Sequence, residues 1–452
     1  YNLMNMDSET WNEFCSEVTK IYNNLQSNNG GNVASYIPQL AKVNPDFLGI
    51  SIFSIDGRVF NIGDTKENFC IQSCSKTLTY AVALRDNGIE SVNKHIGREP
   101  SGARFNAFIF DEDNKPFNPL INSGAIMAAS LIKNNHTEDK RFEYIVDIWK
   151  SIVGKKNVGF DNPVYLSEKR SANRNHALAH LMMENNIFPE DTEINTTLEF
   201  YFQLCSITMN SESLAKYAAM LSNGGTTVDT NIKIFDPKIV RDLLCIMYTS
   251  GMYDYSGRWS FDIGLPAKSG VSGAIFAVIP NIGGVCVYSP RLDEMGNSVR
   301  GVEFFKQLTK TYNIHIFDTL ISGLNEKKSI SKSNEIESDK IFKLCKKNSY
   351  GNLKKLLYKI NCDVDKGDYD NRRPLHIAVD DNSYLSTFAL LEHGADYSVK
   401  DRWEQTFLKL MKHKKDRKLS ACFLLYYKIL FVKYWAFSKL KSDLLYNNVN
   451  SL

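Results

Sequence analysis

The sequence lacks the cysteine patterns that mark metal sites and disulfide frameworks. Its nine cysteines are odd in number and scattered along the chain, and no two of them form a Cys-x-x-Cys pair. Cysteine pairs at short spacing are typical of zinc sites, whereas small secreted proteins carry an even set of cysteines. The pattern therefore argues against a zinc site and a disulfide framework, and it favours a reducing compartment.

A strong excess of charge of either sign is also missing. Lysine and arginine together number 54, and aspartate and glutamate together number 51, so the formal net charge is only +3. Proteins that bind nucleic acid carry a basic surface, and the nearly balanced charge of this sequence gives no indication of one. We expect no nucleic-acid partner.

A membrane-spanning run is missing from the apolar tail. The stretch from Ala421 to Phe437 is interrupted by Lys428 and Lys433, and it is shorter than the roughly 20 residues that a span requires. A helix on a membrane surface is one interpretation, but we favour an apolar end that caps the preceding segment. The chain opens at Tyr1 rather than at methionine, so we expect a fragment or a processed form whose targeting segment lies outside the sequence.

What the sequence does contain is ample material for folded cores. Its 452 residues predict two or three domains, and a 43% share of hydrophobic residues is enough to fill them. Apolar residues roughly alternate from 48 to 60 around Asp56-Gly57, which predicts a β-hairpin. Residues 274–278 and 285–288 predict a second hairpin.

Helical patterns occupy the chain between the two hairpins. After Lys76 the apolar residues recur at helical spacing, and Asn87-Gly88 supplies a stop. The regions around 141–153 and 197–222 are also predicted to be helical. A sheet built from both ends of a domain, with helices inserted between, indicates an α/β architecture.

The last third of the chain has a different organisation. Residues 322–338 are polar, charged and aperiodic, which predicts a linker. Beyond them, pairs such as Asp368 and Asp401 recur at a spacing of 33, the ankyrin period. Arg373–Ala378 matches the ankyrin signature Thr-Pro-Leu-His-x-Ala at five of six positions, whereas the next copy is degraded. About two repeats are fewer than the three or so that a stack needs, so we expect them to lean on the preceding domain or on another subunit.

The predicted organisation therefore has four parts. They are an α/β catalytic domain over 1–321, the linker over 322–338, an all-α ankyrin repeat segment over 339–413 and an atypical apolar tail over 414–452.

Two serines lie beside one lysine in the stretch Cys70–Tyr80. Ser73 and Lys76 are three residues apart and share a helix face, whereas Ser75 adjoins the lysine in sequence and does not face it. A lone Ser-x-x-Lys is a weak signal, because most such pairs lie on solvated helix faces. Here Lys268-Ser269-Gly270 directly precedes a predicted strand, and β-lactamases and penicillin-binding proteins combine these two elements. Ser73 is therefore the predicted nucleophile, Lys76 its base, and Lys268 a second cation that lowers the pKa of that base.

Longer stretches make the resemblance specific. The sequence resembles the phosphate-activated, kidney/liver-type glutaminases, whose catalytic domain has a serine β-lactamase-like fold with an antiparallel sheet and helices. The similarity spans about residues 30 to 310, and the ankyrin repeats follow as they do in that family. The matching stretches are Tyr36–Lys42, Gln72–Lys76, Glu99–Gly102, Asn122–Ile126, Phe200–Ser206, Cys245–Tyr253 and Gly264–Val271.

The resemblance implies a role for each candidate residue. Glutamine carries an α-ammonium, an α-carboxylate and a side-chain amide, so its site needs an acid, hydrogen-bond donors and a nucleophile. Glu168 is expected to hold the ammonium, and it would share one helix face with Asn175, seven residues on, if that segment is helical. The backbone N–H groups of Ser73 and Val271 are expected to form an oxyanion hole. The other substrate-binding positions implied are Tyr36, Asn122, Asn175, Tyr201 and Tyr253.

The implied reaction is hydrolysis of L-glutamine to L-glutamate and ammonia. Ser73 attacks the amide carbon with Lys76 as base, Tyr253 helps to protonate the leaving ammonia, and water resolves the ester. The reaction requires no metal or organic cofactor. A β-lactamase-like peptidase or esterase is an alternative, but it would leave Glu168 and Asn175 unexplained. An inactive ankyrin scaffold is another, and the intact Ser73, Lys76 and Tyr253 speak against it.

The loop Gly102–Phe110 resembles the one that gates the site of these enzymes and helps them to assemble. Related sequences carry a lysine where this chain has Ala107, and they also differ at 108–110. The resemblance implies a homotetramer or higher assembly, inorganic phosphate as an activator and a mitochondrial location, and the ankyrin repeats imply a protein partner. The changes in this loop bear on the phosphate dependence and on the assembly.

Overall fold

The computed structural model describes residues 8–318, 327–328, 341–359, 364–368, 370–414, 416–421, 423–426 and 428. The chain divides into two compact units, Tyr1–Ser331 and Lys332–Leu452, and the division falls within the predicted linker. Most of the apolar tail predicted over 414–452 lies outside the described residues. Among the helices that are described, none combines the length and the apolar character needed to cross a membrane.

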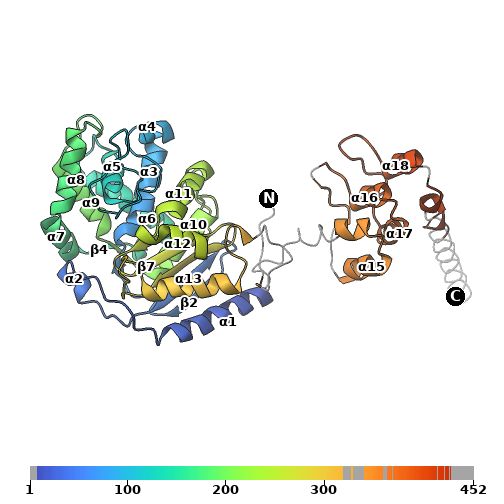
Figure 1. Cartoon of the computed structure of the whole chain (residues 1–452), viewed down its shortest axis with the longest axis horizontal. Coiled ribbons are helices and arrows are strands. Elements are labelled where there is room, and N and C mark those ends of the chain that lie inside the picture. Colours follow the sequence, from blue (N-terminus) through green and yellow to red (C-terminus); the bar gives the residue numbers. More distant parts are fainter. Residues whose placement is uncertain are drawn as a thin grey trace, which may run out of the picture. The chain divides into compact units, whose positions relative to one another are not determined.

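A five-stranded antiparallel sheet lies at the centre of the first unit (Figure 1). Its order is β2-β1-β8-β7-β6, so the first two strands of the chain pair with its last three. Both predicted hairpins are confirmed. Gly57 in the first turn has a φ of 87°, a conformation that glycine adopts without strain. The strands are β1 (Gly49–Ser54), β2 (Val59–Gly63), β6 (Ala267–Gly270), β7 (Ala274–Ile279) and β8 (Gly283–Tyr288).

The two faces of this sheet belong to different hydrophobic cores. Along β7, Ile275 and Ala277 contribute to one core, and Phe276 and Val278 contribute to the other. This alternation is the two-residue period of a strand. Helices α1 (Ser8–Leu25) and α13 (Val299–Thr311) cover the first face, and α10 (Ser211–Ser222) covers the second (Figure 1). Gly284 permits the close approach of α10, because a Cβ there would lie 2.3 Å from a backbone oxygen of that helix.

Most of the helices lie between the two halves of the sheet in sequence, as predicted. Helix α3 (Ser75–Asn87) ends at Gly88, whose φ is 78°, so the predicted stop is confirmed. Most of α3 is buried, which places its side chains inside the unit rather than on a solvated face. The other helices are α2 (Pro38–Ala41), α4 (Ile89–Asn93), α5 (Asn122–Ser130), α6 (Glu138–Val153), α7 (Asn162–Ser171), α8 (Asn173–Glu184), α9 (Ile194–Cys205), α11 (Pro237–Ser250) and α12 (Ser256–Asp262), with 3₁₀ turns η1 (Gln72–Cys74), η2 (Lys155–Asn157) and η3 (Tyr253–Tyr255).

A small three-stranded sheet leads into the start of α3. Its order is β3 (Phe69–Cys70), β5 (Ile207–Met209) and β4 (Gly159–Phe160). The N–H of Ile71 donates to the Ile207 carbonyl at 2.8 Å, so the pairing extends one residue past β3. The chain therefore enters the η1 turn directly from an anchored strand.

The second unit is built from short helices around one core. These are α15 (Tyr350–Lys359), α16 (Pro374–Asp380), α17 (Tyr384–Glu392) and α18 (Phe407–Lys414). His376 connects successive segments, because its Nδ1 accepts a hydrogen bond from the Arg373 N–H at 3.0 Å and its Nε2 lies 3.2 Å from the Gln405 carbonyl.

Two residues of the predicted linker pack on the first unit. Lys328 exchanges backbone hydrogen bonds with Thr311 and Asn313, and the Lys327 ammonium lies 3.1 Å from both carboxylate oxygens of Asp318. Backbone pairing of this kind leaves no side-chain pattern. These two residues therefore belong to the first unit, which the aperiodic sequence does not reveal.

A buried arginine closes the C-terminal end of α5. The Arg141 guanidinium donates to the carbonyls of Ala129 at 2.7 Å and Ile132 at 3.0 Å, and it lies over the Phe200 ring at 4.5 Å. The last carbonyls of a helix have no partner within the helix, so a cation that binds them is stabilising. Arg141 is only 2% exposed.

Replacing Arg141 with methionine should destabilise the first unit. The change removes two charge-assisted hydrogen bonds from buried carbonyls, and the Ala129 carbonyl keeps only its bond from the Ile132 N–H. We therefore expect a loss of about 2–4 kcal/mol in the free energy of unfolding. Urea-induced unfolding followed by tryptophan fluorescence measures this loss. Arg241→Met is the matched control, since Arg241 makes only an exposed ion pair with Asp242 and should change stability by less than about 0.5 kcal/mol. Equal losses in the two variants would contradict this role of Arg141.

Candidate active site

The η1 turn presents its two serines differently. Gln72, at the first position of the turn, has a φ of 47°, a left-handed conformation that non-glycine residues rarely adopt. The Ser75 hydroxyl donates to the Gln72 carbonyl at 2.8 Å and is buried, so it is used within the turn. Ser73 is only partly buried. Strained backbone of this kind is common where a turn must aim one side chain.

Two lysine side chains are buried beside this turn. The Lys76 ammonium donates to Asn122 Oδ1 at 2.7 Å and to the Leu120 carbonyl at 3.3 Å. The Lys268 ammonium donates to the Ser269 carbonyl at 2.6 Å. Burial lowers the pKa of Lys76 from 10.5 to about 8. It lowers the pKa of Lys268 to about 7, and repulsion from Lys76 adds to that effect.

Strand β6, at the edge of the large sheet, carries Lys268 to the turn. The strand packs against η1, and the Cys74 thiol lies 3.8 Å from the Lys268 carbonyl. A Cβ on Gly270 would lie 3.0 Å from the Ile71 carbonyl and 3.2 Å from Cys74 Sγ. The glycine of Lys-Ser-Gly therefore allows the strand to approach the turn. Val271 follows directly after the strand.

Tyr253 lies between the turn and the edge strand. Its φ is 53°, so it is a second site residue with left-handed backbone. The Lys268 ammonium lies 4.4 Å from the centre of its ring, in a cation–π contact. Burial raises the pKa of the Tyr253 hydroxyl, and the nearby Ser73 side chain partly opposes this shift. The hydroxyl is buried and makes no hydrogen bond of normal geometry within the described part of the chain.

An acidic group faces the turn from α7. Glu168 Oε1 accepts hydrogen bonds from the Tyr36 hydroxyl at 2.7 Å and from Gln72 Nε2 at 3.2 Å. Burial raises the pKa of Glu168, and these two hydrogen bonds oppose the rise. The Tyr36 side chain as a whole is 51% exposed, but its hydroxyl points inward to Glu168. Tyr36 therefore lies at the open side of the site.

Three predicted polar residues meet around one amide. Asn122 Nδ2 donates to Asn175 Oδ1 at 3.0 Å, and the Tyr201 hydroxyl lies 3.4 Å from Asn122 Oδ1. The same Oδ1 accepts from Lys76. Asn122 is thus a direct link between the lysine and the other predicted substrate-binding residues.

Glu168 and Asn175 do not lie on one helix, so the condition for the shared face is not met. Helix α7 ends at Ser171 and α8 begins at Asn173, and Ala172 between them has a non-helical ψ of 21°. Serine and asparagine compete with helix interiors through local hydrogen bonds, which favours a break at this point. The two residues approach the site from separate helices.

An apolar cluster holds the segments that carry Tyr36, Glu168 and Val271. Ile37, Leu40, Cys70 and Val164 pack together there, and Val271 packs against them. Ile37 follows Tyr36 in sequence, and Val164 lies one turn before Glu168 on α7. Local packing therefore fixes three positions that are far apart in the chain.

The loop Gly102–Phe110 covers the lysine side of the site. The Phe105 ring lies 4.9 Å from the Tyr253 ring and 5.9 Å from the Lys76 ammonium. The Phe105 carbonyl accepts from the Asn122 N–H at 2.9 Å. Arg174 of α8 donates to the Asn106 carbonyl at 3.1 Å and lies over the Phe108 ring. The loop is thus attached to residues next to two predicted substrate ligands.

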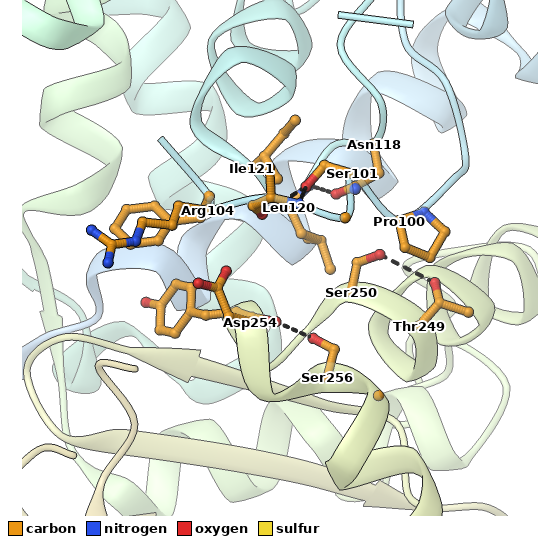
Figure 2. A pocket seen from close by; sticks show the side chains of 15 residues that line it. Pro100, Ser101, Arg104, Asn118, Leu120, Ile121, Thr249, Ser250, Asp254 and Ser256 are labelled. Atoms are coloured by element: carbon orange, nitrogen blue, oxygen red, sulfur yellow. Dashed lines mark hydrogen bonds between the residues drawn. The ribbon is translucent and has the colours of Figure 1, made fainter. Parts of the chain in front are cut away.

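A cavity of about 540 Å³ adjoins this loop (Figure 2). Phe105 and Tyr253 belong to its lining. Ser73, Lys76, Glu168 and Asn175 do not, so the cavity lies beside the predicted catalytic residues rather than around them.

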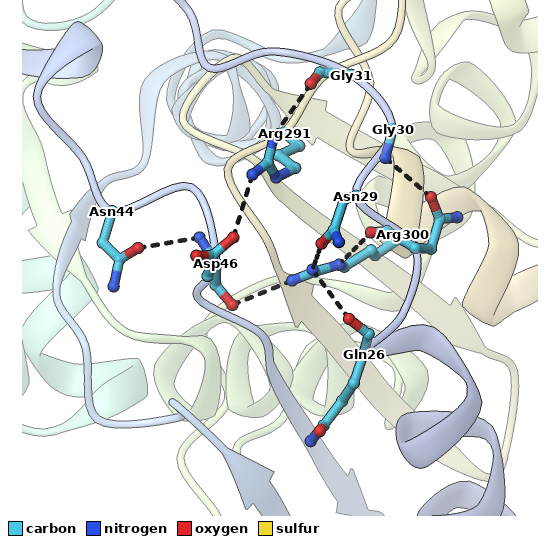
Figure 3. Close-up of polar contacts among 9 residues, drawn as sticks. Gln26, Asn29, Gly30, Gly31, Asn44, Asp46, Arg291 and Arg300 are labelled. Atoms are coloured by element: carbon cyan, nitrogen blue, oxygen red, sulfur yellow. Dashed lines mark hydrogen bonds and ion pairs between the residues drawn. The ribbon is translucent and has the colours of Figure 1, made fainter.

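A second polar cluster positions the segment before Tyr36. Buried Arg300 donates to the carbonyls of Asn28 at 2.7 Å and Asp46 at 3.0 Å, and Arg291 pairs with the Asp46 carboxylate at 3.1 Å (Figure 3). Asn32 then exchanges backbone hydrogen bonds with Leu292. These contacts hold the chain four residues before Tyr36.

Sequence reasoning did not assign Gln72 and Phe105 to the site. The Gln72 contact with Glu168 joins residues 96 apart in sequence, and no local pattern marks such a pair. Within the described residues, no group of three or more histidine, cysteine or acidic side chains could hold a metal ion.

The fold and the site together define a mixed α/β protein with an accessible serine beside two buried lysines and an acid. Comparisons with known proteins identify the family. Residues 31–317 match the model of the glutaminase family. The chain is 37% identical over 394 residues to the mouse mitochondrial liver isoform of glutaminase, covering 86% of this chain and 65% of that one. It is 42% identical over 316 residues to a glutaminase of the cyanobacterium Nostoc, covering 69% of this chain and 93% of that one.

A solved structure described as a probable glutaminase, ybaS, superposes with a TM-score of 0.64 at 35% identity, covering 68% of this chain and 97% of that one. The chain belongs to the glutaminase family. It is a hydrolase that acts on a linear amide, and the substrate class inferred from the resemblance, glutamine, is confirmed at the level of the family.

The buried Lys76 predicts how glutaminase activity depends on pH. A lysine acts as a base only when neutral, and a pKa of about 8 leaves roughly a tenth of it neutral at pH 7, far more than an exposed lysine. We expect kcat/KM for glutamine to rise with pH through about 7–8. The apparent pKa values of this rise describe the two interacting lysines together rather than Lys76 alone. Steady-state assays from pH 6 to 8.5 measure this rise in kcat/KM. A flat profile across that range would contradict the assignment of a neutral lysine.

Proposed function

We propose that this glutaminase hydrolyses L-glutamine to L-glutamate and ammonia through an acyl-enzyme on Ser73, with Lys76 as the general base. The observation that carries the proposal is the burial of the Lys76 ammonium without a counter-ion among the described residues. Within the described residues it is hydrogen-bonded to two carbonyl oxygens and forms no ion pair. Its neutral form is therefore accessible near neutral pH. The three-residue spacing on adjoining helical turns brings Ser73 to the same face.

The steps follow from this arrangement. Neutral Lys76 takes the Ser73 proton as Oγ bonds to the amide carbon. The C–N bond then breaks, and the leaving nitrogen takes the electron pair and a proton from the Tyr253 hydroxyl, which the Lys76 ammonium reprotonates. Water then attacks the ester carbon with Lys76 again as base, the bond to Ser73 Oγ breaks, and Oγ takes the proton back from Lys76 as glutamate is released. The Lys268 ammonium, held over the Tyr253 ring, stabilises the Tyr253 phenolate that forms when the leaving nitrogen is protonated.

The developing oxyanion needs hydrogen-bond donors. The N–H groups of Ser73 and Val271 are our candidates, because Ser73 lies in the η1 turn and Val271 follows the strand that packs against it. Such donors are worth about 2.7–4 kcal/mol each in the transition state of comparable reactions.

The α-ammonium and α-carboxylate of glutamine, here called its head group, would bind to a second set of residues in the site. Glu168, partly buried and held by hydrogen bonds from Tyr36 and Gln72, would pair with the α-ammonium. Asn122, Asn175 and Tyr201 offer amide and hydroxyl groups for the α-carboxylate and the side-chain amide. No metal or organic cofactor takes part in this scheme.

Two alternatives explain less of the site. A β-lactamase-like peptidase or esterase would not require a partly buried acid to bind an ammonium. An inactive ankyrin scaffold would not require a strained turn at Gln72 or two buried lysines next to it.

The repeat type of the second unit, the assembly, the activator and the cellular location are proposed from the family resemblance and from the second unit itself. The ankyrin assignment over 339–413 is supported by the paired helices α16 and α17 and by His376 linking successive turns. A protein partner for that unit, a homotetramer or higher assembly and activation by inorganic phosphate are proposals of the same kind. A mitochondrial location is supported by the mouse and rat liver isoforms, which are named mitochondrial, although bacterial glutaminases also match.

The two serines of the turn provide a direct test. Ser73→Ala removes the nucleophile and should abolish glutamine turnover. Ser75→Ala is the matched control, since the Ser75 hydroxyl interacts with the Gln72 carbonyl and the Cys205 thiol within the fold, and the variant should keep most of the activity. Ammonia release measures both variants. Comparable losses from the two changes would contradict the assignment of Ser73.

The acid provides a test of substrate specificity. Glu168→Gln leaves the substrate ammonium unpaired in a desolvated site, so kcat/KM should fall by about 10²-fold or more. The control is Glu199→Gln, because the Glu199 carboxylate pairs with exposed Lys169 and accepts from the Tyr165 hydroxyl, and it should change kcat/KM by less than about threefold. The wild type should barely hydrolyse N-acetyl-glutamine, which has no ammonium. Similar turnover of glutamine and N-acetyl-glutamine would favour the peptidase or esterase alternative.

A further inference from the structure

The cavity beside Tyr253 is not used by the proposed binding of glutamine. Its volume of about 540 Å³ is many times the roughly 30 Å³ that one water molecule occupies in the liquid. Figure 2 shows Ser250, Asp254 and Ser256 along one wall and Ser101, Asn118 and Leu120 along the opposite wall. The residues of the head-group side, Glu168 and Asn175 among them, are absent from the lining.

Tyr253 connects this cavity to the reacting atoms. It lines the cavity and also lies beside Ser73 and Lys268. Glutamine is a linear molecule with its ammonium at one end and its amide at the other. If Glu168 holds the ammonium and Ser73 attacks the amide carbon, the leaving nitrogen emerges on the Tyr253 side.

We propose that this cavity is the route by which ammonia leaves the site, and by which other small amines reach the acyl-enzyme. The inference rests on the proposed function, because it takes Ser73 as the acylated residue and Tyr253 as the proton donor. It adds a site for the leaving group that is separate from the site for the head group.

The chemistry of the lining suits ammonia. The hydroxyls of Thr249, Ser250 and Ser101 can donate to its lone pair or accept from its N–H groups. Ammonia takes up a proton in neutral water, and the exposed Asp254 carboxylate at the cavity offers a partner for the ammonium that results. Protonation there makes return to the ester unfavourable, because ammonium has no lone pair with which to attack.

Phe105 separates the cavity from the base. Its ring lies 4.9 Å from the Tyr253 ring and 5.9 Å from the Lys76 ammonium. An apolar side chain here keeps bulk water away from Lys76 and so preserves its lowered pKa. Neutral ammonia crosses such a barrier more readily than an ion, whereas water reaches the ester from the open side at Tyr36.

One glycine allows the route to be narrowed without touching the catalytic residues. Gly257 lies in the first turn of α12 and lines the cavity, and a Cβ added there would meet no atom within 4 Å. It does not have a positive φ. Side chains of increasing size at this position should therefore fill the cavity with little strain.

The test uses hydroxylamine as a small amine that competes with water for the acyl-enzyme. Its nitrogen attacks the ester carbon, the bond to Ser73 Oγ breaks, and glutamyl hydroxamate forms in place of glutamate. The ratio of hydroxamate to glutamate is measured for wild type and for Gly257→Ala, Gly257→Leu and Gly257→Trp in the full chain. Because both products come from the same acyl-enzyme, the ratio does not depend on how much of each variant is folded.

We expect the ratio to be unchanged in Gly257→Ala, lower in Gly257→Leu and at least about fivefold lower in Gly257→Trp. If Gly257→Trp is inactive, the hydroxamate-to-glutamate ratio of Gly257→Leu tests the proposed route. An unchanged ratio in the larger variants would overturn the route while leaving the acyl-enzyme intact. Failure of the wild type to form any hydroxamate would instead contradict the acyl-enzyme, and with it the route.

Discussion

The burial of two lysine side chains without a counter-ion is the constraint on which this active site depends. Lys76 and Lys268 are each about 1% exposed or less, and their described partners are carbonyl oxygens and aromatic rings rather than carboxylates. An ion pair would hold a lysine protonated, whereas burial among uncharged groups favours the neutral form. Removing two ammonium groups from water is unfavourable, but the same burial lowers the pKa of Lys76 enough for it to act as a base near neutral pH.

The surrounding fold maintains this environment from three directions. Helix α3 is buried over most of its length, so Lys76 points into the unit. The edge strand β6 carries Lys268 to the same place, with Gly270 allowing the close approach. Asn122 then joins the base to the groups proposed to bind the substrate, because one amide accepts from Lys76 and donates to Asn175. A change at Asn122 therefore affects base and binding together.

Features that depend on neighbouring residues could be predicted from the sequence, and those that depend on distant ones could not. The two hairpins follow from alternation and turn glycines, and the family follows from long matching stretches. The contact between Lys76 and Asn122 joins residues 46 apart, and the left-handed backbone of Gln72 is a property that no side-chain pattern shows. The break at Ala172 separates Glu168 and Asn175 onto two helices, and the sequence left open whether that segment is one helix.

Direct titration of Lys76 tests the central claim. In protein labelled with ¹⁵N at the lysine side chains, the Lys76 signal is assigned by its loss in Lys76→Met and followed from pH 6 to 11. The account predicts a midpoint near 8 and a neutral amine above it. A Lys76 ammonium that stays protonated beyond pH 10, as an exposed or ion-paired lysine does, would contradict the account.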